Sequence, residues 1–332
     1  MLPEKPWLLI YDNAEEEQLL RGYLPTGAKG SILLTSRHWE NIQHDEHRNG
    51  LTVPLFNQQE GWGLLMKLLG LQWQNEYLEG QTGALEREAG TRLLNHLGGL
   101  TLAIVQAAGL IKEARVTGDR SIRAFLELFE DSHAKLSPRH IGHRDNLIHS
   151  LDTVWSIALN ALSRNARSLL SVLSLLAPDA IPLELFLPND QSRLDGRLEF
   201  CKRSVSDESQ PMVATTVDPS PAMGAALEEL QKANLIYRNG RDLVIHRVTQ
   251  EEMGFHSIKD LEESFDAASQ LVYEAFPKQD QGRPLFNVWP QCQMYVQHAV
   301  NLAKLYTAFR QGRESPFTGS ENFVRLLCNC AW

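Results

Sequence analysis

Long hydrophobic runs are missing from this sequence of 332 residues. The longest apolar run, Leu97 to Ile111, contains Gln106 and three glycines. It falls short of the ~18–20 apolar residues that span a bilayer, so no membrane helix is expected. The first residues show no basic region followed by a long apolar stretch, so the sequence predicts no secretory signal.

Cysteine is scarce, and acidic residues outnumber basic ones. The four cysteines, at positions 201, 292, 328 and 330, do not form the dense pattern of a disulfide framework, which favours a cytoplasmic protein. The net charge of −9 argues against general nucleic-acid binding and leaves room only for a local basic patch. With 43% hydrophobic and 22% charged residues, the composition excludes a mostly disordered chain.

The first segment predicts an α/β layer. Trp7–Tyr11 and Ser31–Thr35 are apolar on both faces, as strands buried in a parallel sheet are. A short helix is expected at Glu15–Leu24 and a third strand at Leu51–Leu55.

The rest of the chain is predicted to be mostly helical. Ser163 has the residue type of a helix N-cap, and Cys201–Pro221 is expected to be a long flexible loop. Asn239-Gly240 between two apolar runs predicts a hairpin with a type I′ turn, and helices followed by a hairpin are the order of a winged helix. Helical spacing of apolar residues marks Glu60–Leu71, Ala84–Leu97, Leu100–Lys112, Ser121–Glu130, Leu147–Ala161, Asn165–Ala177, Ala222–Ala233, Asp260–Phe276 and Trp289–Arg310.

Two strand ends carry polar side chains with chemical potential. Asp12 follows the first strand, at the carboxyl end where α/β sheets bind ligands and where a carboxylate can hold Mg²⁺. Thr35-Ser36-Arg37 follows the second strand, and Arg37 is of the type that binds a phosphate. The plain alternatives are an N-cap for Asp12 and a solvated loop for Arg37.

These two segments together resemble the Walker B and sensor 1 segments of NB-ARC domains, which belong to the STAND class of signal-transduction NTPases. Gly99-Leu100-Thr101-Leu102-Ala103 is similar to that family's Gly-Leu-Pro-Leu-Ala motif, and Ile245-His246-Arg247 to its Met-His-Asp motif. Trp289 to Tyr295, with His298, resembles the helical lead-in to tetratricopeptide repeats in fungal-type, NLR-like members.

The resemblance implies a set of roles for a bound ADP or ATP with Mg²⁺. Asp12 would assist Mg²⁺ and the hydrolytic water, with Asn13 beside it. Thr35 and Arg37 would belong to the sensor of the γ-phosphate. Leu100 and Thr101 would lie near the adenine, and His246 would contact the β-phosphate of ADP. The plain alternatives are a core position for Leu100 and a cross-strand position for His246.

The sequence departs from the family at the residues that carry hydrolysis. It contains no Gly-x-x-x-x-Gly-Lys-Ser/Thr loop, and Gly27–Gly30 precedes a strand instead of opening a helix. Asn13 stands at the position of the second Walker B acid, Thr101 replaces a proline and Arg247 replaces an aspartate. The parent family is ATPase-like, but hydrolysis by this chain is not expected. Without the family's central strand, Leu51–Leu55 should pair directly with the second strand or form an exposed edge.

The resemblance implies four parts and a chain truncated at both ends. They are the end of a nucleotide-binding domain (1–56), a helical bundle (57–145), a winged helix with a flexible insertion at 201–221 (146–258) and a lead-in to tetratricopeptide repeats (259–332). The fold class expected is therefore α/β plus mostly α. Protein partners would bind the helical and repeat region, self-oligomerisation would follow ATP exchange, and no membrane contact is expected.

Two alternatives compete with a nucleotide-regulated module, and a metal site is considered besides. The chain could be an interaction scaffold that needs no nucleotide. It could bind DNA through the basic residues of the winged-helix region, which are Lys232, Arg238, Arg241 and Arg247. His44-Asp45-Glu46-His47 has metal-ligand types but no second cluster at zinc-site spacing, so a solvated loop and no metal are expected there.

Overall fold

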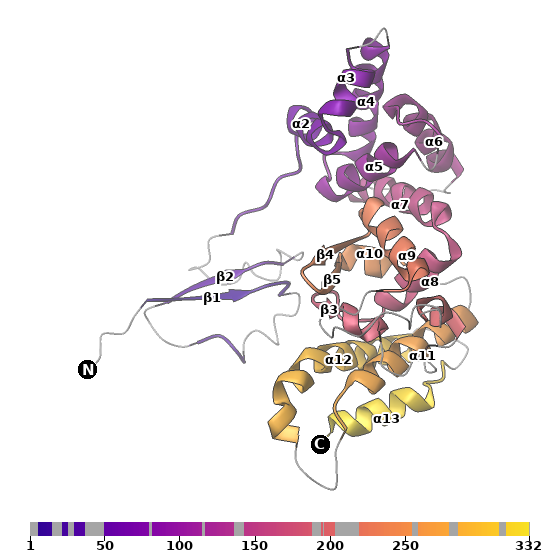
Figure 1. Cartoon of the computed structure of the whole chain (residues 1–332). Helices are drawn as coiled ribbons and strands as arrows, with labels where there is room; N and C mark the ends of the chain where they lie inside the picture. The colour runs from indigo at the N-terminus through magenta and orange to yellow at the C-terminus, as the bar shows by residue number, and fades with distance from the viewer. Residues whose placement is uncertain are drawn as a thin grey trace. The chain divides into compact units, whose positions relative to one another are not determined.

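The computed structural model is mostly helical and has two small sheets in the part of the chain that it describes (Figure 1). It describes residues 6–14, 22–25, 30–36, 50–79, 82–114, 117–135, 143–187, 194, 196–202, 219–253, 258–278, 285–311 and 317–331, without the side chains of 143–149 and 252. The chain divides into two compact units, Met1–Pro54 and Leu55–Trp332. A mostly helical chain with two small sheets is compatible with the expected class of α/β plus mostly α.

The first unit contains a pair of parallel strands, β1 (Trp7–Tyr11) and β2 (Gly30–Leu34), with Leu9 opposite Ile32. The Trp7 indole lies against Gly30, where an added Cβ would approach the ring to 2.0 Å. Both faces of the pair carry exposed apolar side chains: Leu8 keeps 61% and Ile10 56% of their accessible surface on one face, and Trp7 keeps 37% and Leu9 36% on the other.

One segment of the first unit differs from its predicted structure. The prediction of a strand at Leu51–Leu55 is wrong, because this segment has no strand pairing and its side chains are exposed. Neither direct pairing with β2 nor an exposed edge strand is therefore formed there. Most of the helix expected at Glu15–Leu24 lies outside the described residues.

The second unit begins with a helical bundle. Asn57 caps its first helix through a capping box with Glu60. Buried Glu86 accepts the Ile122 N–H at 2.7 Å and so joins two of the helices. The helices are α2 (Gln58–Leu69), α3 (Leu71–Tyr77), α4 (Gly83–Leu97), α5 (Thr101–Glu113), α6 (Ile122–Lys135) and α7 (His143–Ala161).

Short helices and a three-stranded sheet follow. Ser163 caps α8 (Arg164–Leu173) as predicted, accepting the Ala166 N–H at 3.2 Å. The strands β3 (Ile181–Pro182), β4 (Ile236–Asn239) and β5 (Asp242–Ile245) form a sheet in the order β3-β5-β4, with both pairings antiparallel. The other elements are η2 (Leu183–Phe186), η4 (Gly196–Cys201), α9 (Pro221–Lys232) and α10 (Arg247–Glu252).

The hairpin forms, but its turn is one residue later than predicted. Asn239 pairs with Asp242, so Gly240 and Arg241 make the turn. Gly240 has φ 63°, whereas Arg241 is not among the described residues with positive φ. A positive φ at the first turn position alone is the requirement of a type II′ turn, and the predicted type I′ turn is therefore wrong.

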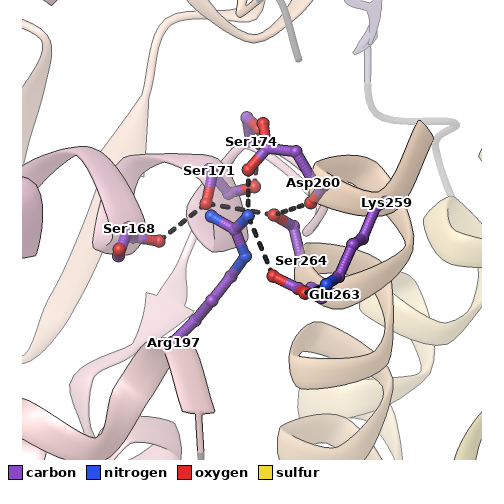
Figure 2. A network of polar contacts seen from close by, with 8 residues as sticks. All are labelled: Ser168, Ser171, Ser174, Arg197, Lys259, Asp260, Glu263 and Ser264. Carbon is purple, nitrogen blue, oxygen red and sulfur yellow. Dashed lines mark hydrogen bonds and ion pairs between the residues drawn. The ribbon is translucent and has the colours of Figure 1, made fainter. Parts of the chain in front are cut away.

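The chain then forms α11 (Ile258–Ala275), η6 (Leu285–Val288), α12 (Trp289–Gln311) and α13 (Glu321–Cys330). Phe265 makes edge-on contacts with Phe317 and Phe323, which joins α11 to α13. Figure 2 shows how Arg197 of η4 reaches Asp260 and Glu263 of α11, while Ser264 donates to Ser171 of α8 at 3.2 Å. These contacts pack α11 directly against α8.

None of the described helices is both long and apolar enough to cross a membrane. The four cysteines are unpaired, and Cys201 and Cys292 are buried. Much of the segment expected to be a flexible loop, 203–218, lies outside the described residues.

Candidate functional site

The carboxyl ends of β1 and β2 bring together three of the residues singled out in the sequence. The Thr35 hydroxyl donates to Asp12 Oδ1 at 2.5 Å and accepts the Asn13 N–H at 2.8 Å. A backbone hydrogen bond joins the same two segments, since the Ala14 N–H donates to the Thr35 carbonyl at 2.7 Å. Asn13 has φ 55°, a left-handed conformation that asparagine tolerates better than most residues.

Parallel strands explain why these residues meet. The register pairs Tyr11 with Leu34, so Asp12 and Thr35 leave the sheet at the same edge. A carboxylate has about four lone-pair positions, and the bond from Thr35 occupies one of them. Asp12 is exposed and can still receive water or a hydrated cation. Arg37 lies outside the described residues.

Leu100 and Thr101 lie where α5 begins, in the second unit. Leu100 is the N-cap residue, and no side chain caps this end of the helix. Gly98 and Gly99 turn the chain with φ 58° and 75°, and the Gly99 carbonyl accepts the Phe56 N–H at 3.0 Å. Thr101 is exposed, whereas Leu100 and Leu102 are half-buried against the core. The alternative of a core position for Leu100 thus agrees in part with the structure, because its side chain is half-buried.

His246 is the N-cap of α10. Its Nδ1 accepts the Val248 N–H at 3.2 Å, which requires an unprotonated Nδ1. Partial desolvation lowers the pKa of His246, Arg247 adds to this effect and Glu251 opposes it. The residue still contacts solvent. When Nδ1 accepts, the neutral ring carries its proton on Nε2, which can donate to an anionic ligand.

Arg247 forms an ion pair with Asp179 at 3.2 Å. Sequence reasoning missed Asp179, and it missed the capping role of His246. Histidine is not among the preferred N-cap residues, and a pair separated by 68 positions leaves no local signal.

The described residues contain no group of three or more potential metal-ligating side chains from His, Cys, Asp and Glu. His44–His47 lies outside the part of the chain that the structure describes. Asp12, Asn13 and Thr35 belong to the first compact unit, where hydrogen bonds bring them together, and Leu100, Thr101 and His246 belong to the second.

Comparison with protein families matches residues 157–260, from α7 into α11, to a model described as a domain of unknown function, DUF7779. A nucleotide-binding leucine-rich repeat (NLR)-like protein of Hyaloscypha variabilis is 30% identical over 142 residues, which cover 38% of this chain and 13% of the relative. A late blight resistance protein homolog of Solanum demissum is 30% identical over 118 residues, 34% of this chain and 9% of the relative. The chain thus spans about a tenth of these curated relatives and is similar to NLR-like and resistance proteins over about a third of its own length.

Proposed function

We propose that this chain is a regulatory, partial ADP/ATP-binding module of an NLR-like signalling protein of the STAND class. The observation that carries the proposal is the bond from Thr35 to Asp12, because it joins the Walker B-like and sensor 1-like segments at one sheet edge. The similarity to a protein whose name includes nucleotide binding supports it.

The order of elements from α8 to β5 supports a winged helix within this module. A helix, a short strand, two short helical turns, a helix and a hairpin follow one another, and the first strand pairs with the last. In this proposal the parts are the end of a nucleotide-binding domain (1–56), a helical bundle (57–145), the winged helix (146–258) and a lead-in to tetratricopeptide repeats (259–332).

The residues present fit Mg²⁺ and ADP in part. Asp12 can accept from the water shell of Mg²⁺, the uncapped start of α5 offers backbone N–H groups, and the His246 Nε2–H can meet a phosphate oxygen. Arg37 would add the γ-phosphate contact that the resemblance implies.

Hydrolysis is outside the proposal. Asn13 is a poor base, and the sequence in hand has no phosphate-cradling loop. The role we propose is regulatory: ADP stabilises an inactive arrangement of the parts, and ATP exchange favours protein association by differential binding.

Titration of the full chain with a fluorescent ADP analogue and Mg²⁺ tests the proposal. We expect saturable binding that weakens about tenfold in both His246→Ala and His246→Asn, since both remove the imidazole donor. Asparagine restores an N-cap, so weakening in the alanine variant alone would assign His246 to helix capping. A folded protein without saturable binding would overturn the proposal.

A nucleotide-independent scaffold is the second candidate, and one observation favours it. Large apolar side chains on α12 and α13 are exposed, namely Trp289, Met294, Val296, Val300, Val324 and Leu327. Exposed apolar residues on neighbouring helices are suited to protein partners. A stable fold that shows no ADP binding and captures a protein partner through these helices would favour this candidate.

The contacts of the basic residues disfavour DNA binding. Lys232 pairs with Glu228 at 2.9 Å, Arg241 with Glu184 at 3.1 Å and Arg247 with Asp179 at 3.2 Å. Arg238 donates to the Gly240 carbonyl at 2.8 Å. Cations already paired with acids are less available to phosphates, so salt-dependent duplex binding is not expected.

A further inference from the structure

The carboxyl end of α8 is buried, and its backbone groups are bonded to two distant helices. The helix ends at Leu173, and a turn continues to Ala177. Leu173 and Leu176 are fully buried, and Leu175 nearly so. A helix end leaves carbonyl groups without partners inside the helix, and burial keeps water from supplying them.

The first set of partners comes from β5 and α10. Gln250 Nε2 donates to the Leu176 carbonyl at 2.7 Å and lies 3.5 Å from the Leu173 carbonyl. The Ile245 N–H donates to the Pro178 carbonyl at 3.1 Å. Together with the Arg247–Asp179 ion pair, these bonds fix the beginning of α10 against the turn.

The second set of partners comes from α12. His298 Nδ1 accepts the Ala177 N–H at 3.1 Å, and Asn301 Nδ2 donates to the Leu175 carbonyl at 3.0 Å. The two residues are three positions apart and therefore share one face of α12. His298 is fully buried and Asn301 is half-buried, so the bond at Ala177 is shielded from solvent.

We infer that α10 and α12 are conformationally coupled through the end of α8, so that displacement of α10 loosens α12. The bonds from the two helices alternate along one short backbone segment: Gln250 binds at Leu176, between the Asn301 bond at Leu175 and the His298 bond at Ala177. The turn cannot move with one helix without breaking its bonds to the other. A broken bond here leaves a buried polar group unpaired, which is far more costly than at a solvated helix end.

The regulatory meaning of this coupling rests on the proposed function. α10 begins directly after His246, the residue proposed to meet the nucleotide phosphate. A ligand-dependent shift of His246 would move α10, and through the turn it would change the packing of α12. The coupling is reciprocal, so a partner bound to α12 would alter the affinity at His246 by the same factor.

Hydrogen–deuterium exchange on the nucleotide-free full chain tests the coupling. Gln250→Met keeps the side-chain volume and removes the donor, and Asn301→Leu does the same on α12. We expect Gln250→Met to raise exchange in the α12 peptides and Asn301→Leu to raise it in the α10 peptides, each about tenfold. Gln293→Met, at an exposed position of α12, is the matched control and should change neither helix.

Exchange in α2 to α4 reports on global destabilisation and should stay unchanged. The double variant Gln250→Met/Asn301→Leu should raise exchange by less than the product of the two single effects, because either change alone frees the turn. An effect confined to the mutated helix, or effects that multiply, would overturn the inference. Because this experiment contains no nucleotide, its result does not depend on whether the chain binds ADP. Absence of coupling would in turn not contradict ADP binding.

Discussion

Thr35 and Asp12 lie 23 positions apart in the chain, and a hydrogen bond of 2.5 Å joins Thr35 Oγ1 to Asp12 Oδ1. The same hydroxyl accepts the Asn13 N–H, so one side chain orders both polar residues that follow β1. A hydroxyl can donate and accept at once, and the threonine methyl group contributes to neither bond.

Thr35→Val therefore should loosen the edge of the strand pair. We expect exchange in peptides covering residues 7–14 to rise about threefold to tenfold, because two hydrogen bonds at an exposed site are lost. Thr35→Ser keeps the hydroxyl and should stay close to the original chain. Equal exchange in the valine and serine variants would contradict the role of this hydroxyl. Hydrogen exchange of the full chain measures the effect.

The contact between α5 and the end of α9 depends on Gly109. A Cβ at this position would lie 2.4 Å from Asn234 Nδ2 and 2.7 Å from the Lys232 carbonyl. The backbone carbonyl cannot rotate away, so Gly109→Ala should lower the free energy of unfolding by about 1–3 kcal/mol. Gly224→Ala in α9 is the control, since its Cβ meets nothing within 4 Å, and it should raise stability by up to ~1 kcal/mol. Urea unfolding followed by circular dichroism compares the two.

Burial makes the stability of the chain depend on pH through His298. Burial lowers the pKa of His298 to about 4, against 6.5 for the ordinary group. Between these pH values, His298 binds a proton in the unfolded chain but not in the folded chain. Its contribution to the free energy of unfolding is therefore fully present above pH 6.5 and is lost as the pH decreases toward 4. The loss should reach roughly 3 kcal/mol.

His298→Asn tests this dependence. Asparagine offers an oxygen to the Ala177 N–H but does not titrate, so the slope of unfolding free energy against pH should become flatter between pH 4 and 6.5. Urea unfolding at a series of pH values gives that slope. The same slope in both proteins would assign the dependence to other groups.

The exposed faces of the β1–β2 pair should promote association. Leu8 and Ile10 lie on one face with 61% and 56% of their surface exposed, and edge strands with apolar faces pair readily with other chains. Leu8→Ser with Ile10→Thr should shift a concentration-dependent mixture toward monomer in sedimentation velocity. Leu71→Ser on α3, a helix whose leucine is 76% exposed but is not part of the strand pair, should leave the distribution unchanged. Equal shifts in the two variants would rule out a special role for the strand pair.

Local patterns predicted the elements whose causes are local. Leu100–Lys112 was expected to be a helix from its apolar spacing, and α5 spans Thr101–Glu113. The edge that gathers Asp12 and Thr35 follows from two apolar parallel strands, because their carboxyl ends must meet.

Distant contacts decided the features that the sequence could not predict. The helix expected to reach Ala177 ends at Leu173, because the following backbone groups bond to Gln250, Asn301 and His298. The hairpin turn moved by one residue where β5 also pairs with β3 and the Leu183 N–H binds the Arg241 carbonyl. Neither the periodicity of apolar residues nor the turn residues in a sequence indicate contacts between residues so far apart in the chain.

The two ends of α8 also constrain how the chain is made. Glu229 of α9 accepts the Ser163 N–H at 2.6 Å at one end, and His298 lies 121 positions beyond its partner Ala177 at the other. On a ribosome, the helix emerges long before either group exists to complete it. The carboxyl end of α8, which is buried in the folded chain, must remain hydrated until α12 has been synthesised. The native packing of α8 is therefore a late event governed by long-range loop closure.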